Sequence, residues 1–144
     1  IAIFGVNQKE TGKKITLKPA LTLKSKFISI KKVKKGGKVG YDGSWSAKKD
    51  SVIGILPIGY ADGYPVTLSN NGYVLVNGKK ANVIGRISMD LIAIDLTSLP
   101  NADYESDVIL YGEGLPIEVI SKLAGIIPYS LMTSLTERVK KKYI

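Results

Sequence analysis

Short apolar stretches, many alternating with polar residues and separated by turn residues, extend over most of the chain. Residues 21–27 alternate at period two, which predicts a half-buried strand, and the lysines and glycines of residues 34–38 then indicate a turn. Residues 52–58 are almost continuously apolar and end at Gly59, as is typical of a buried strand. The pattern therefore favours short strands over helices in this part of the chain.

The clearest local signal is a hairpin turn at Asn77-Gly78. Residues 73–76 form an apolar run before it, and residues 81–87 follow it as the partner strand. Two more apolar runs follow at close spacing, at residues 91–96 and 108–111. Strands spaced in this way indicate a mainly β fold, as a small barrel or a sandwich.

The last part of the chain carries a different pattern. Residues 116–124 begin with a proline, repeat apolar residues at helical spacing and end before Gly125, which predicts a short amphipathic helix. A second proline opens residues 128–135, which we predict as another short helix. We also predict a terminal strand at residues 139–144.

Composition limits the classes of protein to consider. The 144 residues are 44% hydrophobic and 23% charged, which is typical of one folded globular domain. The chain has no cysteine and no histidine, which excludes disulfides, thiolate zinc sites and serine–histidine–aspartate catalysis. Because no apolar run approaches the roughly 18 residues of a membrane span, and the N-terminus lacks the charged-then-apolar order of a signal peptide, we expect a soluble cytoplasmic protein.

The net charge of +9 is concentrated in lysine-rich stretches, at residues 24–38 and 138–142. Nucleic-acid binding would favour aromatic residues between the lysines, and only Phe27 lies inside the first stretch. Solvated strand edges, where lysine discourages edge-to-edge pairing, are the preferred interpretation. A basic β-module that binds nucleic acid remains the alternative.

Three glycine-bracketed motifs carry the candidate chemistry: Val-Gly-Tyr-Asp-Gly-Ser-Trp at residues 39–45, Pro-Ile-Gly-Tyr-Ala-Asp-Gly-Tyr-Pro at 57–65, and Gly-Arg-Ile-Ser-Met-Asp at 85–90. Without histidine or cysteine, a proton-transfer group must be a tyrosine, a carboxylate or a lysine. Tyr41 and Tyr60, each preceded by glycine, are the best candidates. The residues alone leave open whether Tyr41 is catalytic or an aromatic side chain beside a turn.

In order and spacing, these motifs resemble the C-terminal half of alanine racemase. The resemblance also includes Leu17-Lys-Pro-Ala-Leu-Thr-Leu-Lys-Ser, Val76-Asn-Gly, Tyr111-Gly, Leu115-Pro and Ile127-Pro-Tyr129. It implies a small closed Greek-key-type β-barrel with one or two short helices near the C-terminus, over residues 7–144. Residues 1–6, which include Ile-Ala-Ile-Phe-Gly, would be the last strand of an N-terminal (β/α) barrel that holds pyridoxal phosphate on a lysine.

The resemblance also implies roles for single residues. Racemisation needs two bases on opposite faces of the α-carbon, and pyridoxal phosphate takes up the electrons. One base of the family is the barrel lysine, and the tyrosine supplied across the homodimer interface resembles Tyr41. A phenol has a pKa of about 10, so it needs a nearby cation. The other roles are substrate binding by the Met89 backbone, lining of the substrate entrance by Tyr60, Arg86 and Asp90, and cofactor-phosphate binding by Tyr129.

We therefore expect part of an enzyme that interconverts L- and D-alanine for peptidoglycan, inactive without its barrel. Two positions depart from the family pattern. Asp42 stands where glycine is usual after the tyrosine, and Val66 stands where arginine often follows Tyr-Pro. A relative that acts on serine or basic amino acids is the alternative substrate class.

Overall fold

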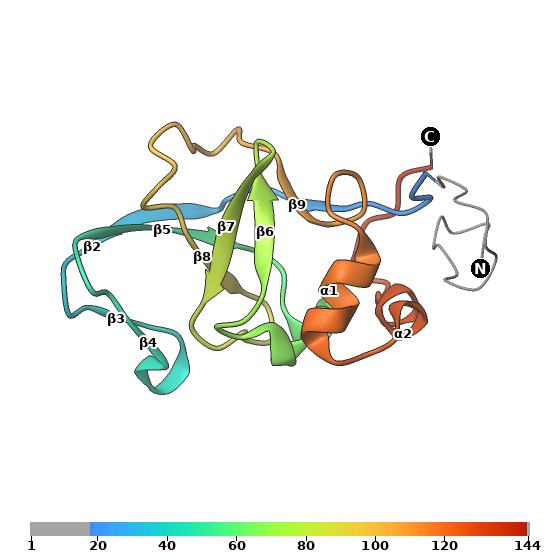
Figure 1. Ribbon diagram of the computed structural model, residues 1–144, viewed down its shortest axis with the longest axis horizontal. Helices are drawn as coiled ribbons and strands as arrows, with labels where there is room; N and C mark the ends of the chain where they lie inside the picture. Colours follow the sequence, from blue (N-terminus) through green and yellow to red (C-terminus); the bar gives the residue numbers. More distant parts are fainter. Residues whose placement is uncertain (1–17, 144) are drawn as a thin grey trace.

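The computed structural model describes residues 18–143 and contains a seven-stranded sheet with the order β1-β9-β6-β7-β8-β5-β2. All its strand pairs are antiparallel. The strands are β1 (Leu23–Ser25), β2 (Ser29–Val33), β5 (Ser51–Leu56), β6 (Tyr73–Val76), β7 (Lys79–Ile84), β8 (Ile92–Asp95) and β9 (Val108–Tyr111). The sheet curls as a half-barrel, and β6 and β7 cross the direction of β2 and β5 (Figure 1).

Smaller elements are attached at the two ends of this sheet. They are the ribbon of β3 (Lys38–Val39) and β4 (Trp45–Ser46), the 3-10 turns η2 (Tyr41–Gly43), η3 (Tyr60–Asp62) and η4 (Val66–Leu68), and the helices α1 (Ile117–Ala124) and α2 (Pro128–Thr133). The β3–β4 ribbon projects at one end of the molecule, and α1 and α2 lie at the other (Figure 1). No helix within residues 18–143 is long and apolar enough to cross a membrane.

One hydrophobic core fills the inside of the curled sheet. Alternate residues of β6 and β8 point inward, so Val74, Val76, Ile92 and Ile94 are at most 2% exposed. Helix α1 adds Ile120, which is fully buried, to the same core. Each fully buried side chain of this size contributes about 1.5–3 kcal/mol. The sheet and helices therefore form one folding unit.

The structure confirms the mainly β class and the two helices predicted near the C-terminus. The strands at 73–76 and 108–111 match residue for residue, and the Asn77-Gly78 hairpin pairs Val76 with Lys79. The other strands and helices predicted between residues 21 and 135 are present with ends that differ by up to three residues.

Two strands differ between the prediction and the structure. The terminal strand predicted at 139–144 is wrong over the described residues 139–143, because the Val139 N–H bonds to Thr136 O (3.2 Å) and the following residues are exposed without a sheet partner. Strand β2 was not predicted, since the exposed Lys31 and Lys32 interrupt its alternation. The predicted barrel strand at residues 1–6 lies outside the described residues.

Candidate functional site

The turn that begins with Tyr41 is in contact with the segment that carries Arg86. A Cβ atom added to Gly40 would lie 2.6 Å from Arg86 N and 2.9 Å from Gly85 Cα, distances that no side chain tolerates. Both glycines also have positive φ angles, 83° and 72°, which side chains disfavour. Tyr41 and Arg86 therefore directly follow two glycines whose backbones touch, and two motifs 45 positions apart in the sequence meet at one place.

Asp42 adopts the conformation that glycine usually takes. Its φ and ψ angles are 58° and 16°, in the left-handed helical region. Aspartate is one of the few residues with a side chain that visit this region without a large penalty. The departure from the family pattern at this position is therefore compatible with the same turn after Tyr41.

Tyr60 and Met89 are joined by a second close contact between backbones. A Cβ atom on Gly59 would lie 2.3 Å from both Ser88 O and Met89 O. The Tyr60 N–H donates to Ser88 O (3.0 Å), and the Ala61 N–H donates to Met89 O (3.0 Å). Tyr60 is 47% exposed and Met89 51% exposed, so both side chains reach the surface. Within residues 18–143, the Met89 N–H has no acceptor.

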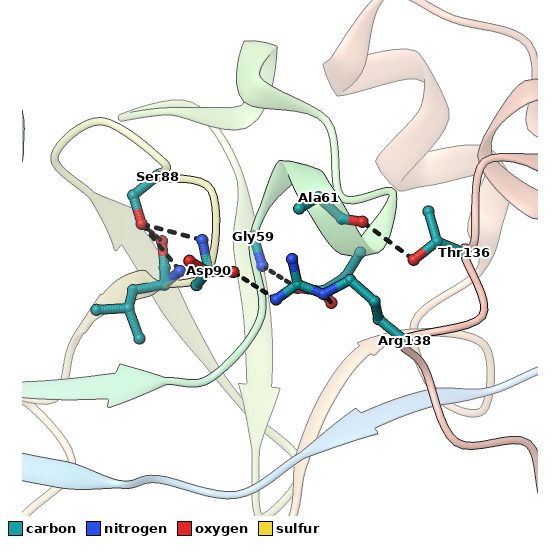
Figure 2. Close-up of polar contacts among 8 residues, drawn as sticks. Gly59, Ala61, Ser88, Asp90, Thr136 and Arg138 are labelled. Carbon is teal, nitrogen blue, oxygen red and sulfur yellow. Dashed lines mark hydrogen bonds and ion pairs between the residues drawn. The ribbon is translucent and has the colours of Figure 1, made fainter.

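A cluster of charged groups fixes the same two segments to the end of the chain (Figure 2). The buried Asp62 carboxylate accepts the Gly59 N–H (2.8 Å) and lies 3.2 Å from Arg138 Nε. The Arg138 guanidinium also binds the Asp90 carboxylate, and that bond, with the charge of Asp62, raises the pKa of Arg138. Thr136 Oγ1 donates to Ala61 O (3.0 Å). Asp90 is therefore one end of an ion-pair bridge.

Tyr129 is carried by α2, beside the η3 turn. Pro128 occupies the first turn of this helix, and Tyr129 is half-buried. The helix end is attached to η3 because Ser134 Oγ donates to Gly63 O (2.9 Å). The Tyr129 hydroxyl makes no hydrogen bond to another residue of the described chain. Val66 begins η4 and is exposed.

Two residues of this region were not predicted from the sequence. Asn70 Oδ1 accepts the Gly85 N–H (2.7 Å), while its Nδ2 donates to Ser44 O (3.2 Å). The only sequence signal is that Asn70 begins Asn-Asn-Gly, which marks a turn. Arg138 was predicted only as part of a basic stretch, and its partners are distant in the sequence.

Comparisons with known proteins agree on one family. The family model of the alanine racemase C-terminal domain matches residues 20–143. An alanine racemase of Coxiella burnetii is 49% identical over 142 residues, which cover 97% of this chain and 39% of the relative. An alanine racemase of Actinobacillus succinogenes is 42% identical, covering 99% of this chain and 40% of the relative.

Solved structures give the same result. The biosynthetic alanine racemase of Pseudomonas aeruginosa has a TM-score of 0.90 and 36% identity, and that of Bartonella henselae with covalently bound pyridoxal phosphate has a TM-score of 0.93 and 35% identity. Each match covers 99% of this chain and 40% of the solved chain. The chain thus spans about two-fifths of the length of the curated relatives that it matches.

Proposed function

Because the chain belongs to the alanine racemase C-terminal domain family, we propose that it supplies one of the two bases of a pyridoxal-phosphate-dependent alanine racemase. The observation that carries this proposal is the contact between Gly40 and Gly85. It brings Tyr41, the proposed base, to the segment of Arg86. The other base is the cofactor lysine of an N-terminal barrel.

Racemisation removes a proton from one face of the α-carbon and returns one to the opposite face, so one base is needed on each side. Pyridoxal phosphate, when bound, takes up the electron pair that the departing proton leaves behind. Tyr41 accepts or returns the proton on its own face. Its exposure of 66% leaves the hydroxyl accessible to a substrate held by another domain.

A phenol is a weak base at neutral pH, so this role requires a cation that favours the phenolate. The Arg86 guanidinium belongs to the segment in contact with the Tyr41 turn and is one such cation within this chain. A barrel residue would provide others. Arg86 therefore has two proposed roles, in the charge balance around Tyr41 and in the lining of the substrate entrance.

The backbone contact between Gly59 and Ser88–Met89 supports the binding of a small amino acid. The Met89 N–H has no acceptor within residues 18–143, so it is available to a substrate carboxylate. Tyr60 lies beside it at the proposed entrance, and Asp90 is held there by Arg138. Because Arg138 offsets the charge of Asp90, the entrance does not repel a substrate carboxylate strongly.

The residues present also fit a contact with the cofactor. Tyr129 is half-buried and its hydroxyl has no partner among the described residues, and a neutral hydroxyl is a suitable donor to a phosphate oxygen. We assign to this chain one phosphate contact. The lysine and the remaining cofactor contacts belong to the proposed barrel.

The proposal includes two partners, the N-terminal barrel of the same enzyme and a second protomer in a cytoplasmic homodimer. Tyr41, Tyr60 and Met89 are large side chains that are about half exposed or more, as expected of a surface that other domains cover. We also propose that the half-barrel closes in the intact enzyme. The sheet order supports closure because it begins with β1 and ends with β2, which are consecutive in the chain.

The experiment that tests this proposal uses the intact enzyme with Tyr41→Phe. We expect turnover in both directions to fall by about a hundredfold to ten-thousandfold, the range for loss of a general base, while the cofactor absorption spectrum is unchanged. Tyr104→Phe is the matched control, since Tyr104 is also an exposed tyrosine (54%) but lies outside the three motifs. Normal turnover of the Tyr41 variant would remove Tyr41 from the mechanism.

A further inference from the structure

The Asn70 side chain joins the turn of Tyr41 to the segment of Arg86. Its Oδ1 accepts the Gly85 N–H (2.7 Å), and its Nδ2 donates to Ser44 O (3.2 Å). Ser44 is the C-terminal boundary residue of the Tyr41 turn, and Gly85 is the residue before Arg86. From this bridge we infer that Asn70 is a positioning residue, which sets where Tyr41 stands relative to Arg86. The inference rests on the proposed function.

The element that carries Tyr41 has little support of its own. Strands β3 and β4 share the pairs Lys38–Ser46 and Val39–Trp45, and two backbone hydrogen bonds between Ala47 and Gly36–Gly37 extend them (2.7 and 2.9 Å). A two-stranded ribbon of this length is still marginal in isolation. No side-chain hydrogen bond caps the η2 turn. The contact between Gly40 and Gly85 leaves no room for side chains, and no backbone hydrogen bond joins these two glycines to hold them in register. The amide of Asn70 provides this restraint.

Asn70 itself is attached to the core. It follows Ser69, whose Oγ accepts the Ile87 N–H (3.0 Å) and donates to Val66 O (2.6 Å). Leu68 is fully buried, and Thr67 Oγ1 donates to Ala124 O (2.8 Å) in α1. The segment of residues 66–70 is therefore anchored in the core, and its side chains hydrogen-bond the residues on both sides of Arg86, which are Gly85 and Ile87. Within this segment, Asn70 is the residue that also hydrogen-bonds the β3–β4 ribbon, through Ser44 O.

The amino acid at this position must meet two demands. Its φ angle is 55°, which asparagine and glycine tolerate better than other residues. It must also accept one hydrogen bond and donate another. Glycine satisfies the backbone alone, and aspartate keeps the acceptor for Gly85 but faces Ser44 O with a second acceptor. Substitution by glycine or by aspartate therefore separates the effect of the backbone conformation at position 70 from the effect of the side-chain hydrogen bonds.

The test compares Asn70→Gly with Asn77→Gly in the intact enzyme. Asn77 is a matched control because it also has a positive φ (48°) and also bridges two groups, donating to Ser106 Oγ and accepting from the Asp107 N–H, both at 2.9 Å. It lies in the β6–β7 turn, outside the three motifs. Each variant loses two side-chain hydrogen bonds and keeps a residue suited to its φ angle.

Turnover is measured in both directions, with L- and D-alanine carrying hydrogen or deuterium on the α-carbon. Displacement of a base by about 1 Å costs up to a hundredfold in rate, so we expect Asn70→Gly to lower kcat about ten- to hundredfold. The proton transfer at Tyr41 becomes more rate-limiting. In Asn70→Gly, the deuterium kinetic isotope effect on turnover should therefore rise for the enantiomer that gives its proton to Tyr41 and fall for the other enantiomer. Asn77→Gly should leave both isotope effects unchanged.

Equal changes in the two Asn→Gly variants, with unaltered isotope effects, would overturn the inference. If Asn70→Gly does not accumulate as folded enzyme, Asn70→Asp provides the same readout, because it keeps the Gly85 bond and loses the Ser44 bond. Tyr41→Phe separates the two proposals. A crippled Tyr41 variant beside normal Asn70 variants overturns this inference alone, whereas a fully active Tyr41 variant overturns the proposed function.

Discussion

Arg138 Nε lies 3.2 Å from Asp62 Oδ1, and this pair ties the end of the described chain to the turn that begins with Tyr60. The two partners differ in environment, since the Asp62 side chain is 9% exposed and the Arg138 side chain 51%. Asp62 also accepts the Gly59 N–H (2.8 Å). The buried Asp62 carboxylate therefore stabilises the turn through a hydrogen bond, and the more exposed Arg138 guanidinium neutralises the charge of that carboxylate.

We expect Asp62→Ala to lower stability, because the Gly59 N–H loses its acceptor in a buried place. A lost buried hydrogen bond of this kind costs about 1–3 kcal/mol, measurable as a decrease in the free energy of unfolding in urea. Asp50→Ala is the control, since Asp50 pairs with Lys34 at 2.7 Å on the open surface. A similar loss in the two variants would contradict the importance of burial.

Gly40→Ala tests the contact between backbones. Gly36 has almost the same φ angle, 85° against 83°, but a Cβ atom at Gly36 meets nothing within 4 Å. Gly36→Ala should therefore cost only the left-handed strain, about 1–2 kcal/mol, whereas Gly40→Ala adds a collision with Arg86 N. We expect only Gly40→Ala to reduce turnover of the intact enzyme, by at least tenfold. Equal turnover of the two variants would show that the contact does not position Tyr41.

Asp42 provides a test of the conformation after Tyr41. Asp42→Gly suits the φ angle of 58°, so turnover should stay within about twofold of the starting enzyme. Asp42→Val places a β-branched residue in a region that it strongly disfavours and should lower turnover severalfold or more. Steady-state kinetics of the intact enzyme distinguish the two. Loss of activity in Asp42→Gly would show that turnover depends on the Asp42 carboxylate and not on the backbone conformation after Tyr41.

Tyr64 and Tyr111 are buried, and their hydroxyls have no partner among the described residues. Burial raises the pKa of both phenols above the ordinary value. The folded protein therefore binds these protons more tightly than the unfolded chain. Their stabilising contribution is complete below about pH 10, the pKa of an exposed phenol, and is lost progressively as the pH rises above it.

Tyr64→Phe removes one hydroxyl with no hydrogen bond to lose. We expect the free energy of unfolding at pH 7 to stay the same or to rise by up to about 1 kcal/mol. Between pH 10 and 11.5, the variant should lose less stability than the starting protein. Urea unfolding at several pH values checks both expectations, and a clear destabilisation at pH 7 would indicate that the hydroxyl has a partner.

Local chemistry explains which parts of the fold were predictable from the sequence. The β6–β7 hairpin follows from adjacent residues, because Asn77-Gly78 permits only a few turn types and Val74 and Val76 alternate with outward positions. Strand β2 depends on pairing with β5, and neither Lys31 nor Lys32 indicates that pairing. Residues 139–143 show the reverse case, since Val139 is followed by three exposed lysines and no strand of the sheet pairs with this segment.

The same reasoning applies to the candidate site. Glycine-bracketed motifs singled out Tyr41 and Tyr60 as candidates, because glycine marks places where backbones approach closely. Met89 became a candidate only through the resemblance to alanine racemase. The residues that hold these motifs together were missed. The Asn70 bond to Ser44 spans 26 positions and the Arg138 bond to Asp90 spans 48, and no local pattern encodes such partners.

The ribbon that carries Tyr41 contributes little to the interior. None of residues 38–46 is buried, and none of them belongs to the buried core cluster. The proposed base and the buried core of the domain thus lie in separate stretches of sequence. A ribbon from a related racemase could be transplanted onto this β scaffold without redesign of its interior, provided that Asn70 and Gly85 remain to receive it.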